Sequence, residues 1–191
     1  MPVKILTPGK KYTIEQAVTF YSLHNSDVNN LIPTFIQYGK QASHITEFGV
    51  NVGKSLTAWI ASKPKTLICY DIKKLTDFDL PRYQNWAKEF GINFKFTLGN
   101  TLYIDIEPTE LLYIDDFHSY KHVHIELQKH GNKSSKFILL HDTVTFGERG
   151  QDGTKPGLNY AISLFLKSNP HWKIKEILTI GNGLTILQRN S

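Results

Sequence analysis

The segment His44–Asp71 reads HITEFGVNVGKSLTAWIASKPKTLICYD and decides the expected fold. It begins as an apolar strand, turns at Gly49 and Gly53, runs through a helix and ends in a second apolar strand that closes on Asp71. Glycines let backbone approach a ligand, a helix start presents unpaired N–H groups, and one carboxylate can accept from two ribose hydroxyls. This order predicts a pocket for a nucleotide-type ligand.

Strands and helices alternate along the rest of the chain. Alternation of this kind predicts parallel strands with right-handed crossovers, and the dense apolar runs indicate strands that are buried on both faces. The last two runs, WKIKEILTI and LTILQR, flank Gly181-Asn182-Gly183, which indicates an antiparallel hairpin. Five earlier strands are expected at residues 44–48, 66–70, 93–98, 111–114 and 136–140. Helices are expected between and after them at 55–61, 80–90, 120–130 and 157–167. The predicted fold is therefore α/β and doubly wound, with a mostly parallel seven-stranded sheet that ends in an antiparallel hairpin.

Residues 1–43 are expected to form a helical lead-in to a domain that spans residues 44–191. A helix is predicted from Thr13, because Thr13 and Gln16 have the spacing of a capping box. A second helix is expected over residues 27–38, with a break or kink at Pro33. These helices could cover the pocket or form a homodimer contact, and the sequence leaves both open.

Composition and charge restrict the class of protein. The 191 residues carry a net charge of +5 without any run of five or six basic residues, so an ordinary charged surface is favoured over a nucleic-acid footprint. The single cysteine, Cys69, cannot form an internal disulfide, which indicates a reducing compartment. No stretch approaches the roughly 20 apolar residues that span a bilayer, and the amino terminus has no signal-type apolar core. A cytoplasmic protein without membrane contact is expected.

Three phrases of the sequence resemble one family. Glu47–Gly53 reads EFGVNVG, an acid-x-Gly-x-x-x-Gly form, whereas a dinucleotide fingerprint would read G-x-G-x-x-G. Leu111–Tyr120 reads LLYIDDFHSY and Phe137–Thr143 reads FILLHDT. With the closing GNGLTILQR, these phrases resemble class I S-adenosylmethionine-dependent methyltransferases. The subgroup is that of the cephalosporin-hydroxylase-like, macrocin-type and rhamnosyl O-methyltransferases, and Asp116-Phe117 stands where that subgroup usually has Gly-Asp.

The resemblance implies S-adenosylmethionine as cofactor and a Rossmann-like methyltransferase fold over roughly residues 26–189. The loop after the first strand would surround the methionine part and the ribose, Asp71 would hold the ribose diol, and Asn100 would meet the adenine edge. The residues expected to contact the cofactor are Glu47, Gly49, Asn51, Gly53, Ser55, Asp71, Asn100 and Asp115. Simpler roles stay open, namely a helix N-cap for Ser55, a solvated acid for Asp71 and a turn residue for Asn100.

The ends of two later strands carry the expected chemistry. In catechol-type relatives one acid after the fourth strand and one after the fifth bind the metal, and Asp115 and Asp142 match those places. Oxygen ligands suit Mg²⁺, which would lower the pKa of a substrate hydroxyl. Those relatives place a basic residue three positions after the first acid, so His118 is the expected general base, with Asp115 beside it. The acids could instead cap helices or pair with histidine, and a zinc pair of His118 and His122 is a further alternative.

The predicted function is O-methylation of a small-molecule or sugar hydroxyl, with metal assistance as an option. The polar loop Thr145–Pro156 could recognise the acceptor through Glu148 and Arg149. An RNA or protein acceptor is the first alternative, since the chain is mildly basic. However, the phrase Ile114–Phe117 lacks the prolines of base-modifying N-methyltransferases. A non-catalytic protein that binds S-adenosylmethionine is the second alternative, and a nicotinamide-dependent reductase is disfavoured by the glycine spacing.

Overall fold

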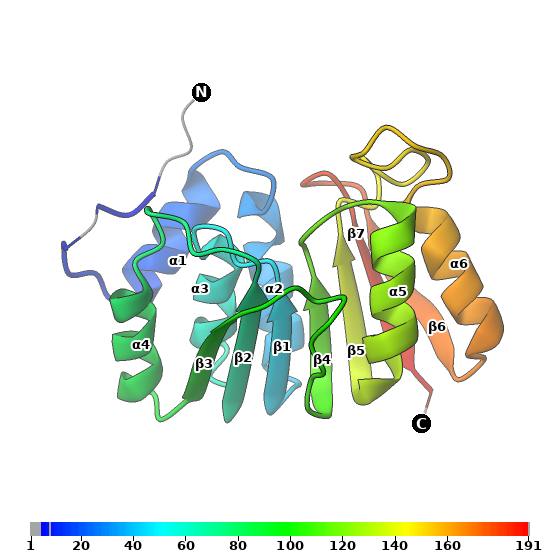
Figure 1. Ribbon diagram of the computed structural model, residues 1–191. Helices are drawn as coiled ribbons and strands as arrows, with labels where there is room; N and C mark the ends of the chain where they lie inside the picture. Colours follow the sequence, from blue (N-terminus) through cyan, green and yellow to red (C-terminus); the bar gives the residue numbers. More distant parts are fainter. Residues whose placement is uncertain (1–4, 8, 191) are drawn as a thin grey trace.

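A single seven-stranded sheet organises the chain (Figure 1). The structure is a computed structural model that describes residues 5–7 and 9–190. The strand order is β3-β2-β1-β4-β5-β7-β6, with β1 to β5 parallel and β7 antiparallel to both of its neighbours. The strands are β1 His44–Phe48, β2 Thr66–Asp71, β3 Asn93–Leu98, β4 Thr109–Ile114, β5 Ser134–His141, β6 Trp172–Leu178 and β7 Leu184–Arg189. The predicted fold class, including the terminal hairpin, is confirmed.

Helices cover both faces of the sheet (Figure 1). One face packs against α1 to α4, and the other packs against α5 and α6. The helices are α1 Ile14–Leu23, α2 Ile32–Gly39, α3 Lys54–Ala61, α4 Leu80–Glu89, α5 Tyr120–His130 and α6 Leu158–Ser168, with 3-10 turns at Asn29–Leu31 and Gly131–Lys133. None of the helices within residues 5–7 and 9–190 is long and apolar enough to cross a membrane.

Strand β4 explains why the central strands read as unbroken apolar runs. Successive side chains on a strand point to opposite faces. Leu111 and Tyr113 therefore belong to the core under α1 to α4, whereas Leu112 and Ile114 belong to the core under α5 and α6. All four are at most 2% exposed. Because both faces are covered, every position needs an apolar side chain, as in other parallel sheets.

The amino-terminal helices pack into the same core as the sheet. The predicted capping box is present, since Thr13 Oγ1 accepts from the Gln16 amide at 3.2 Å and Gln16 Oε1 accepts from the Thr13 amide at 2.9 Å. The helix expected over 27–38 begins only at Ile32, after a 3-10 turn, with Pro33 in its first turn. From α2, the buried ring of Phe35 lies 5.1 Å from the ring of Trp59 on α3.

The hairpin between β6 and β7 is joined to the ends of other elements. Gly181, Asn182 and Gly183 all have positive φ, as a tight turn between strands requires. A Cβ at Gly181 would collide with the carbonyl oxygen of Asp27, so the turn rests on the segment between α1 and α2. That contact brings the amino-terminal segment to the carboxyl ends of the parallel strands, where ligands of open α/β sheets bind.

Candidate active site

The loop between β1 and α3 passes very close to the end of β4. Gly49 has a φ of 80°, and a Cβ there would collide with the carbonyl oxygen of Asp115. Asp71, at the tip of β2, holds the same loop by accepting hydrogen bonds from the amides of Val50 at 2.9 Å and Asn51 at 3.0 Å. The loop backbone is therefore fixed before any ligand binds, and the Asp71 carboxylate stays at the rim of the cavity beside it.

Glu47 lies beneath this loop, fully buried, and reaches neither cavity. Its carboxylate accepts from Ser55 Oγ at 2.5 Å, Trp59 Nε1 at 3.1 Å and Cys69 Sγ at 3.3 Å. Burial raises the pKa of Glu47 to about 8 although these donors oppose the change. In this structure Glu47 anchors the start of α3 from below, so the expected contact with a ligand would require it to leave three partners.

Gly53 also has a structural reason for being glycine. It caps α3 with a φ of 86°, and a Cβ there would collide with the ring of Tyr83. Tyr83 also donates its hydroxyl to the carbonyl of Gly53 at 2.9 Å. Gly53 lines neither cavity, and it rather than Ser55 forms the N-cap of α3.

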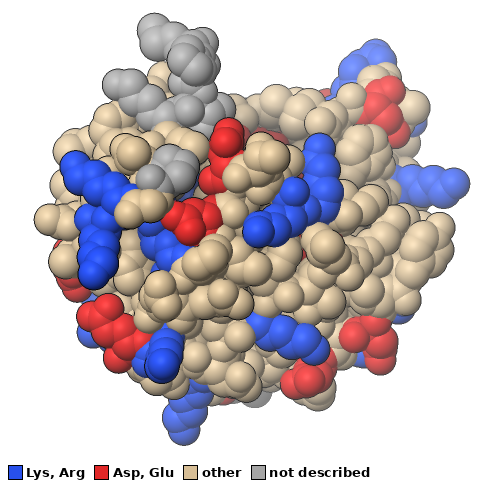
Figure 2. Space-filling view, turned by 60° about the vertical axis from the view of Figure 1, so that its left-hand side comes forward, with Lys and Arg blue, Asp and Glu red and all other residues tan. Residues whose placement is uncertain are grey.

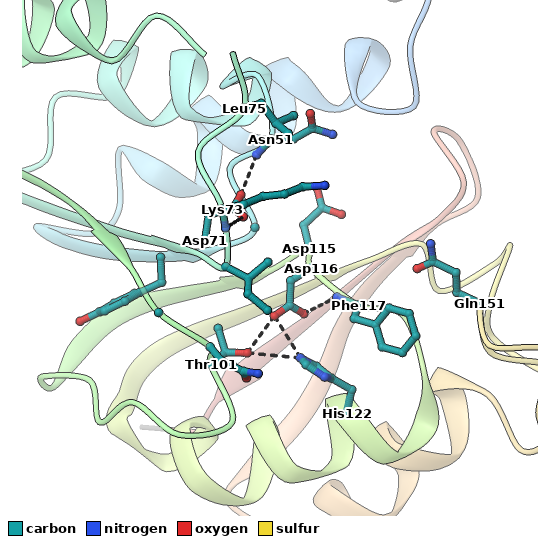
Figure 3. Close-up of a pocket in the computed structure, with 15 residues that line it drawn as sticks. Asn51, Asp71, Lys73, Leu75, Thr101, Asp115, Asp116, Phe117, His122 and Gln151 are labelled. Carbon is teal, nitrogen blue, oxygen red and sulfur yellow. Dashed lines mark hydrogen bonds and ion pairs between the residues drawn. The ribbon is translucent and has the colours of Figure 1, made fainter. Parts of the chain in front are cut away.

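Two joined cavities open at the carboxyl ends of the strands. The first has a volume of about 390 Å³ and lies between the ends of β2, β3 and β4 (Figure 3). The second has a volume of about 1050 Å³ and extends toward α1 and the segment that follows it. The residues that line both are Gly49, Asn51, Asp115, Asp116 and Gln151. A ligand could therefore span from one cavity to the other past the tip of β4.

The first cavity combines apolar and polar walls (Figure 3). Ile72 and Phe117 line it while remaining 70% and 44% exposed, which is unusual for side chains of this kind and suits a flat apolar ligand. Asn100 also lines it, but its Oδ1 accepts from the Leu102 amide at 2.9 Å, so that oxygen closes a turn. Asp71 and Thr101 supply the polar side.

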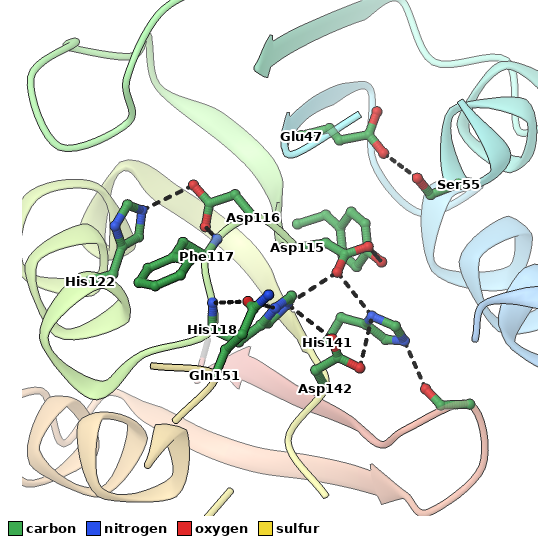
Figure 4. Close-up of polar contacts among 12 residues, drawn as sticks. Glu47, Ser55, Asp115, Asp116, Phe117, His118, His122, His141, Asp142 and Gln151 are labelled. Atoms are coloured by element: carbon green, nitrogen blue, oxygen red, sulfur yellow. Dashed lines mark hydrogen bonds and ion pairs between the residues drawn. The ribbon is translucent and has the colours of Figure 1, made fainter. Parts of the chain in front are cut away.

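The first cluster, which we define as Asp115, His118, His141 and Asp142, adjoins the second cavity (Figure 4). Asp115 Oδ1 lies 3.3 Å from His118 Nε2 and 2.9 Å from His141 Nδ1, and Oδ2 accepts from the Tyr113 hydroxyl at 2.8 Å. Burial favours a raised pKa for Asp115, but the two histidines hold it well below its usual value. The predicted pair, Asp115 and Asp142, is thus brought together with two histidines.

The two histidines of this cluster have different surroundings. His141 is enclosed, with Nδ1 facing Asp115 and Nε2 lying 2.8 Å from the Gly181 carbonyl oxygen. Although burial opposes it, Asp115 raises the pKa of His141 to about 9. His118 lines the second cavity, and its Nε2 is also 3.3 Å from Asp142 Oδ2. Burial acts to lower the pKa of His118, but the neighbouring carboxylates hold it above the ordinary value.

The environment of Asp142 indicates that the first cluster suits a cation. Its backbone has a φ of 60°, and its Oδ1 is buried without a hydrogen-bond partner among residues 5–7 and 9–190. Burial raises the pKa of Asp142. A carboxylate oxygen that has no donor is a ready ligand for a hard cation, so Asp115 and Asp142 fit Mg²⁺ by their donor chemistry.

The sequence predicted no role in the first cavity for several residues that line it. Asp116, Thr101 and His122 line the first cavity, and they lie close together on its wall (Figure 3). His118 and His122, which were considered as a zinc pair, enter different clusters because His118 precedes α5. Only tertiary contacts could have indicated this, since the four-residue spacing indicates a shared face only inside a helix.

The loop between β5 and α6 reaches the cavities through a residue that was not anticipated. Gln151 lines both cavities, and its Oε1 accepts from the His118 amide at 3.4 Å and lies 3.3 Å from His118 Nδ1. Glu148 and Arg149 are exposed and line neither cavity, so the recognition role considered for them has no support in this conformation.

Comparison with solved structures identifies the fold. A candidate caffeoyl-CoA O-methyltransferase from Staphylococcus aureus matches with a TM-score of 0.64 at 15% identity, covering 94% of this chain and 93% of that one. An O-methyltransferase from Bacillus cereus, in complex with SAH, matches with 0.61 at 14% identity, covering 95% and 92%. TomG from Streptomyces achromogenes, an O-methyltransferase involved in tomaymycin synthesis and solved with SAM, matches with 0.60 at 13% identity, covering 97% and 92%.

These matches establish a Rossmann-like methyltransferase fold over nearly the whole chain. No protein-family model and no curated protein matches the sequence. At 10–15% identity, structural similarity shows only the fold. The chemistry of this chain depends on the side chains described above.

Proposed function

We propose that this chain is an S-adenosylmethionine-dependent methyltransferase that transfers the methyl group to a hydroxyl oxygen of a small molecule. The observation that carries the proposal is the pair of joined cavities with the first cluster at their junction. One cavity has the walls of a nucleoside site, and the other has room for an acceptor beside a histidine. A fold whose solved examples hold SAM and SAH supports the same cofactor here.

The first cavity would hold the adenosyl part of the cofactor. Asp71 keeps unused acceptor capacity on its carboxylate, since each oxygen can accept two hydrogen bonds, and this suits a ribose diol. Ile72 and Phe117 would contact the adenine ring. The backbone at Gly49 and Asn51, with Ser55, borders the second cavity, where the methionine part would lie. Asn100 would contribute its amide nitrogen, and Asp115 would stand nearest the sulfonium.

The sulfonium methyl is already activated, so the protein must align the acceptor oxygen and remove its proton. Gln151 Oε1 beside His118 Nδ1 favours a proton on Nδ1, whereas Asp115 and Asp142, each 3.3 Å from Nε2, favour a second proton there. Nε2 would be free to accept the proton of the methyl acceptor once those carboxylates bind Mg²⁺. Asp115 orients that ring. Asp115 and Asp142 would hold Mg²⁺, and bound Mg²⁺ lowers the pKa of an acceptor hydroxyl.

The amino-terminal segment would determine which acceptor molecule fits the second cavity. Residues 23–28, from the last residue of α1 to the start of the following turn, line the second cavity. This supports treating residues 1–43 as a cover for the methyltransferase domain of residues 44–191 that selects the acceptor. A homodimer contact and a cytoplasmic location stay predictions.

A macromolecular acceptor has less support. Figure 2 shows Lys and Arg side chains scattered among acidic and uncharged ones, without a continuous basic track on that face. A small hydroxyl compound is therefore the favoured acceptor.

Calorimetric titration with SAH tests the cofactor assignment. Ile72→Lys places a charge in the first cavity at a side chain that is 70% exposed, so the fold should tolerate it. We expect SAH affinity to fall about tenfold or more, which is about 1.4 kcal/mol. Ile177→Lys, at a 54% exposed position on β6 outside both cavities, is the matched control and should bind as the unmodified protein does. Absence of heat with both SAM and SAH would reject the proposal.

A further inference from the structure

A second cluster of titratable side chains lies beside the first, and the proposed methyl transfer does not use it. We define the second cluster as Asp116, His122 and Glu126, with the hydroxyl of Thr101 beside them. Asp116 follows β4, whereas His122 and Glu126 lie one turn apart on α5 and so share a face of that helix. Figure 3 and Figure 4 show Asp116 and His122 pointing toward each other.

Three oxygen atoms converge on one nitrogen in this cluster. His122 Nε2 lies 3.1 Å from Asp116 Oδ2, 3.2 Å from Thr101 Oγ1 and 3.4 Å from Glu126 Oε1. A single N–H can satisfy only one of them well, and Thr101 already has a contact with Asp116 Oδ2 at 2.9 Å. The cluster therefore places more lone-pair-bearing atoms close together than one shared hydrogen atom can bond.

Glu126 is the most unusual member of the cluster. It is 0% exposed, and neither of its carboxylate oxygens has a hydrogen-bond partner among residues 5–7 and 9–190. Its contact with His122 Nε2 has ion-pair distance but not hydrogen-bond geometry. A buried carboxylate without donors is costly unless a cation compensates it. With His122 protonated and Glu126 ionised, two carboxylates and one imidazolium leave an excess negative charge, which a bound cation or a proton on Glu126 would neutralise.

We propose that the second cluster binds a divalent transition-metal ion of the zinc class. His122 Nε2, Asp116 Oδ2 and Glu126 Oε1 would be its ligands, with Thr101 Oγ1 at the fourth position. In a tetrahedral site with metal–ligand distances near 2.0–2.1 Å, neighbouring ligand atoms lie about 3.3 Å apart. The separations of 3.1 to 3.4 Å around His122 Nε2 match that value.

The surroundings of the cluster favour this kind of ion. Asp116 Oδ1 accepts from the Phe117 amide at 2.7 Å, an outer contact that fixes the carboxylate as it does in metal sites. An imidazole ligand favours Zn²⁺ over Mg²⁺, which prefers oxygen ligands only. A bound ion would tie the segment after β3 to α5 and so stiffen one wall of the first cavity.

Zinc stoichiometry and affinity test the proposal without any acceptor or cofactor. The parent carries both Asp142→Asn and His118→Gln, because these changes leave the first cluster only Asp115 and His141 and so weaken it as a competing zinc site. We expect this parent to keep one Zn²⁺ after gel filtration, measured by elemental mass spectrometry. Adding Glu126→Gln should weaken Zn²⁺ binding at least tenfold in a chelator competition, and adding His122→Gln should do the same. His124→Gln, a neighbouring histidine outside the cluster, is the matched control and should leave the affinity unchanged.

Two measurements separate a lost site from a lost fold. Circular dichroism and thermal melting of the metal-free variants should match those of the metal-free parent, because Glu126→Gln removes a carboxylate that has no donor. Co²⁺ in place of Zn²⁺ should give a tetrahedral visible spectrum in the parent and not in the Glu126→Gln variant. Zn²⁺ affinity that is equal in parent and Glu126→Gln, or a parent that keeps no Zn²⁺, would overturn the proposal. The result is independent of whether SAH binds.

Discussion

Two consecutive residues at the tip of β4, Asp115 and Asp116, enter two clusters that differ in the ratio of acids to histidines (Figure 4). The first cluster pairs two aspartates with two histidines and faces the larger cavity. The second pairs an aspartate and a glutamate with one histidine, His122. The first is neutral when both aspartates are ionised and both histidines are protonated, whereas the second also needs a bound cation or a proton on Glu126.

This difference separates two uses of buried acids. In the first cluster, three neighbours, Tyr113, His118 and His141, hold the Asp115 carboxylate in place. In the second, Glu126 has an ion-pair contact with His122 but no hydrogen-bond partner among residues 5–7 and 9–190. An acid held by several partners can position a base, and a buried carboxylate oxygen without a hydrogen-bond partner, as on Glu126 or at Asp142 Oδ1, is suited to holding a cation.

The largest expected contrast concerns turnover. His118→Ala should lower kcat by about 100-fold or more, because removing a general base typically costs that much. His122→Ala should change kcat by less than about threefold at saturating cofactor, since His122 does not line the acceptor cavity. Both are measured by mass spectrometry on a hydroxyl compound that the unmodified protein methylates. An equal loss of kcat in the two variants would show that the two clusters do not differ in their role in turnover.

The next contrast compares Glu126 with Glu47, a buried acid that has three donors. Glu47→Ala should lower the free energy of unfolding by about 3 kcal/mol, because it leaves a small cavity and the Trp59 indole N–H without an acceptor. Glu126→Gln should change it by less than about 0.5 kcal/mol in metal-free protein, because no donor loses its partner. Urea denaturation at neutral pH measures both. A large loss in Glu126→Gln would mean that the carboxylate has a structural role.

The smallest expected contrast concerns magnesium. With SAH present, Mg²⁺ at ten times its Kd should add about 1.4 kcal/mol to the stability of the unmodified protein. Asp142→Asn should abolish this gain, because it removes the carboxylate oxygen that lacks a donor. Glu126→Gln should retain the gain, because it lies in the other cluster. Thermal melting with and without a chelator gives the comparison, and a gain that survives in Asp142→Asn would exclude metal binding at the first cluster.

The order of elements was predictable because burial on both faces forces continuous apolar runs. Strands β1 and β3 and helix α5 have the bounds that the sequence predicted. Strand β5 starts two residues earlier than expected because the polar residue Ser134 still pairs with β4, opposite Thr109. The amino-terminal 3-10 turn before α2 had no distinct signal.

The candidate site was predictable only in part. Parallel strands end at one edge, so the meeting of Asp71, Asp115 and Asp142 there followed from strand order. The inward turn of Glu47 did not follow, because a strand residue before a glycine loop can face either layer. Gln151 also escaped prediction, since its loop folds back over His118 through tertiary contacts.

The sequence by itself determined the layers, the succession of parallel strands and a final antiparallel hairpin, and the edge where ligands bind, since these depend on apolar periodicity and chain connectivity. Only the tertiary structure decided that Asp115 and Asp116 part into two clusters, and that Glu126 is buried without a donor. The direction of a side chain at a strand tip depends on its contacts with residues that are distant in the sequence. A local sequence pattern does not predict those contacts. The physical reason is that electrostatic partners act through space, whereas sequence spacing constrains only neighbours along one element.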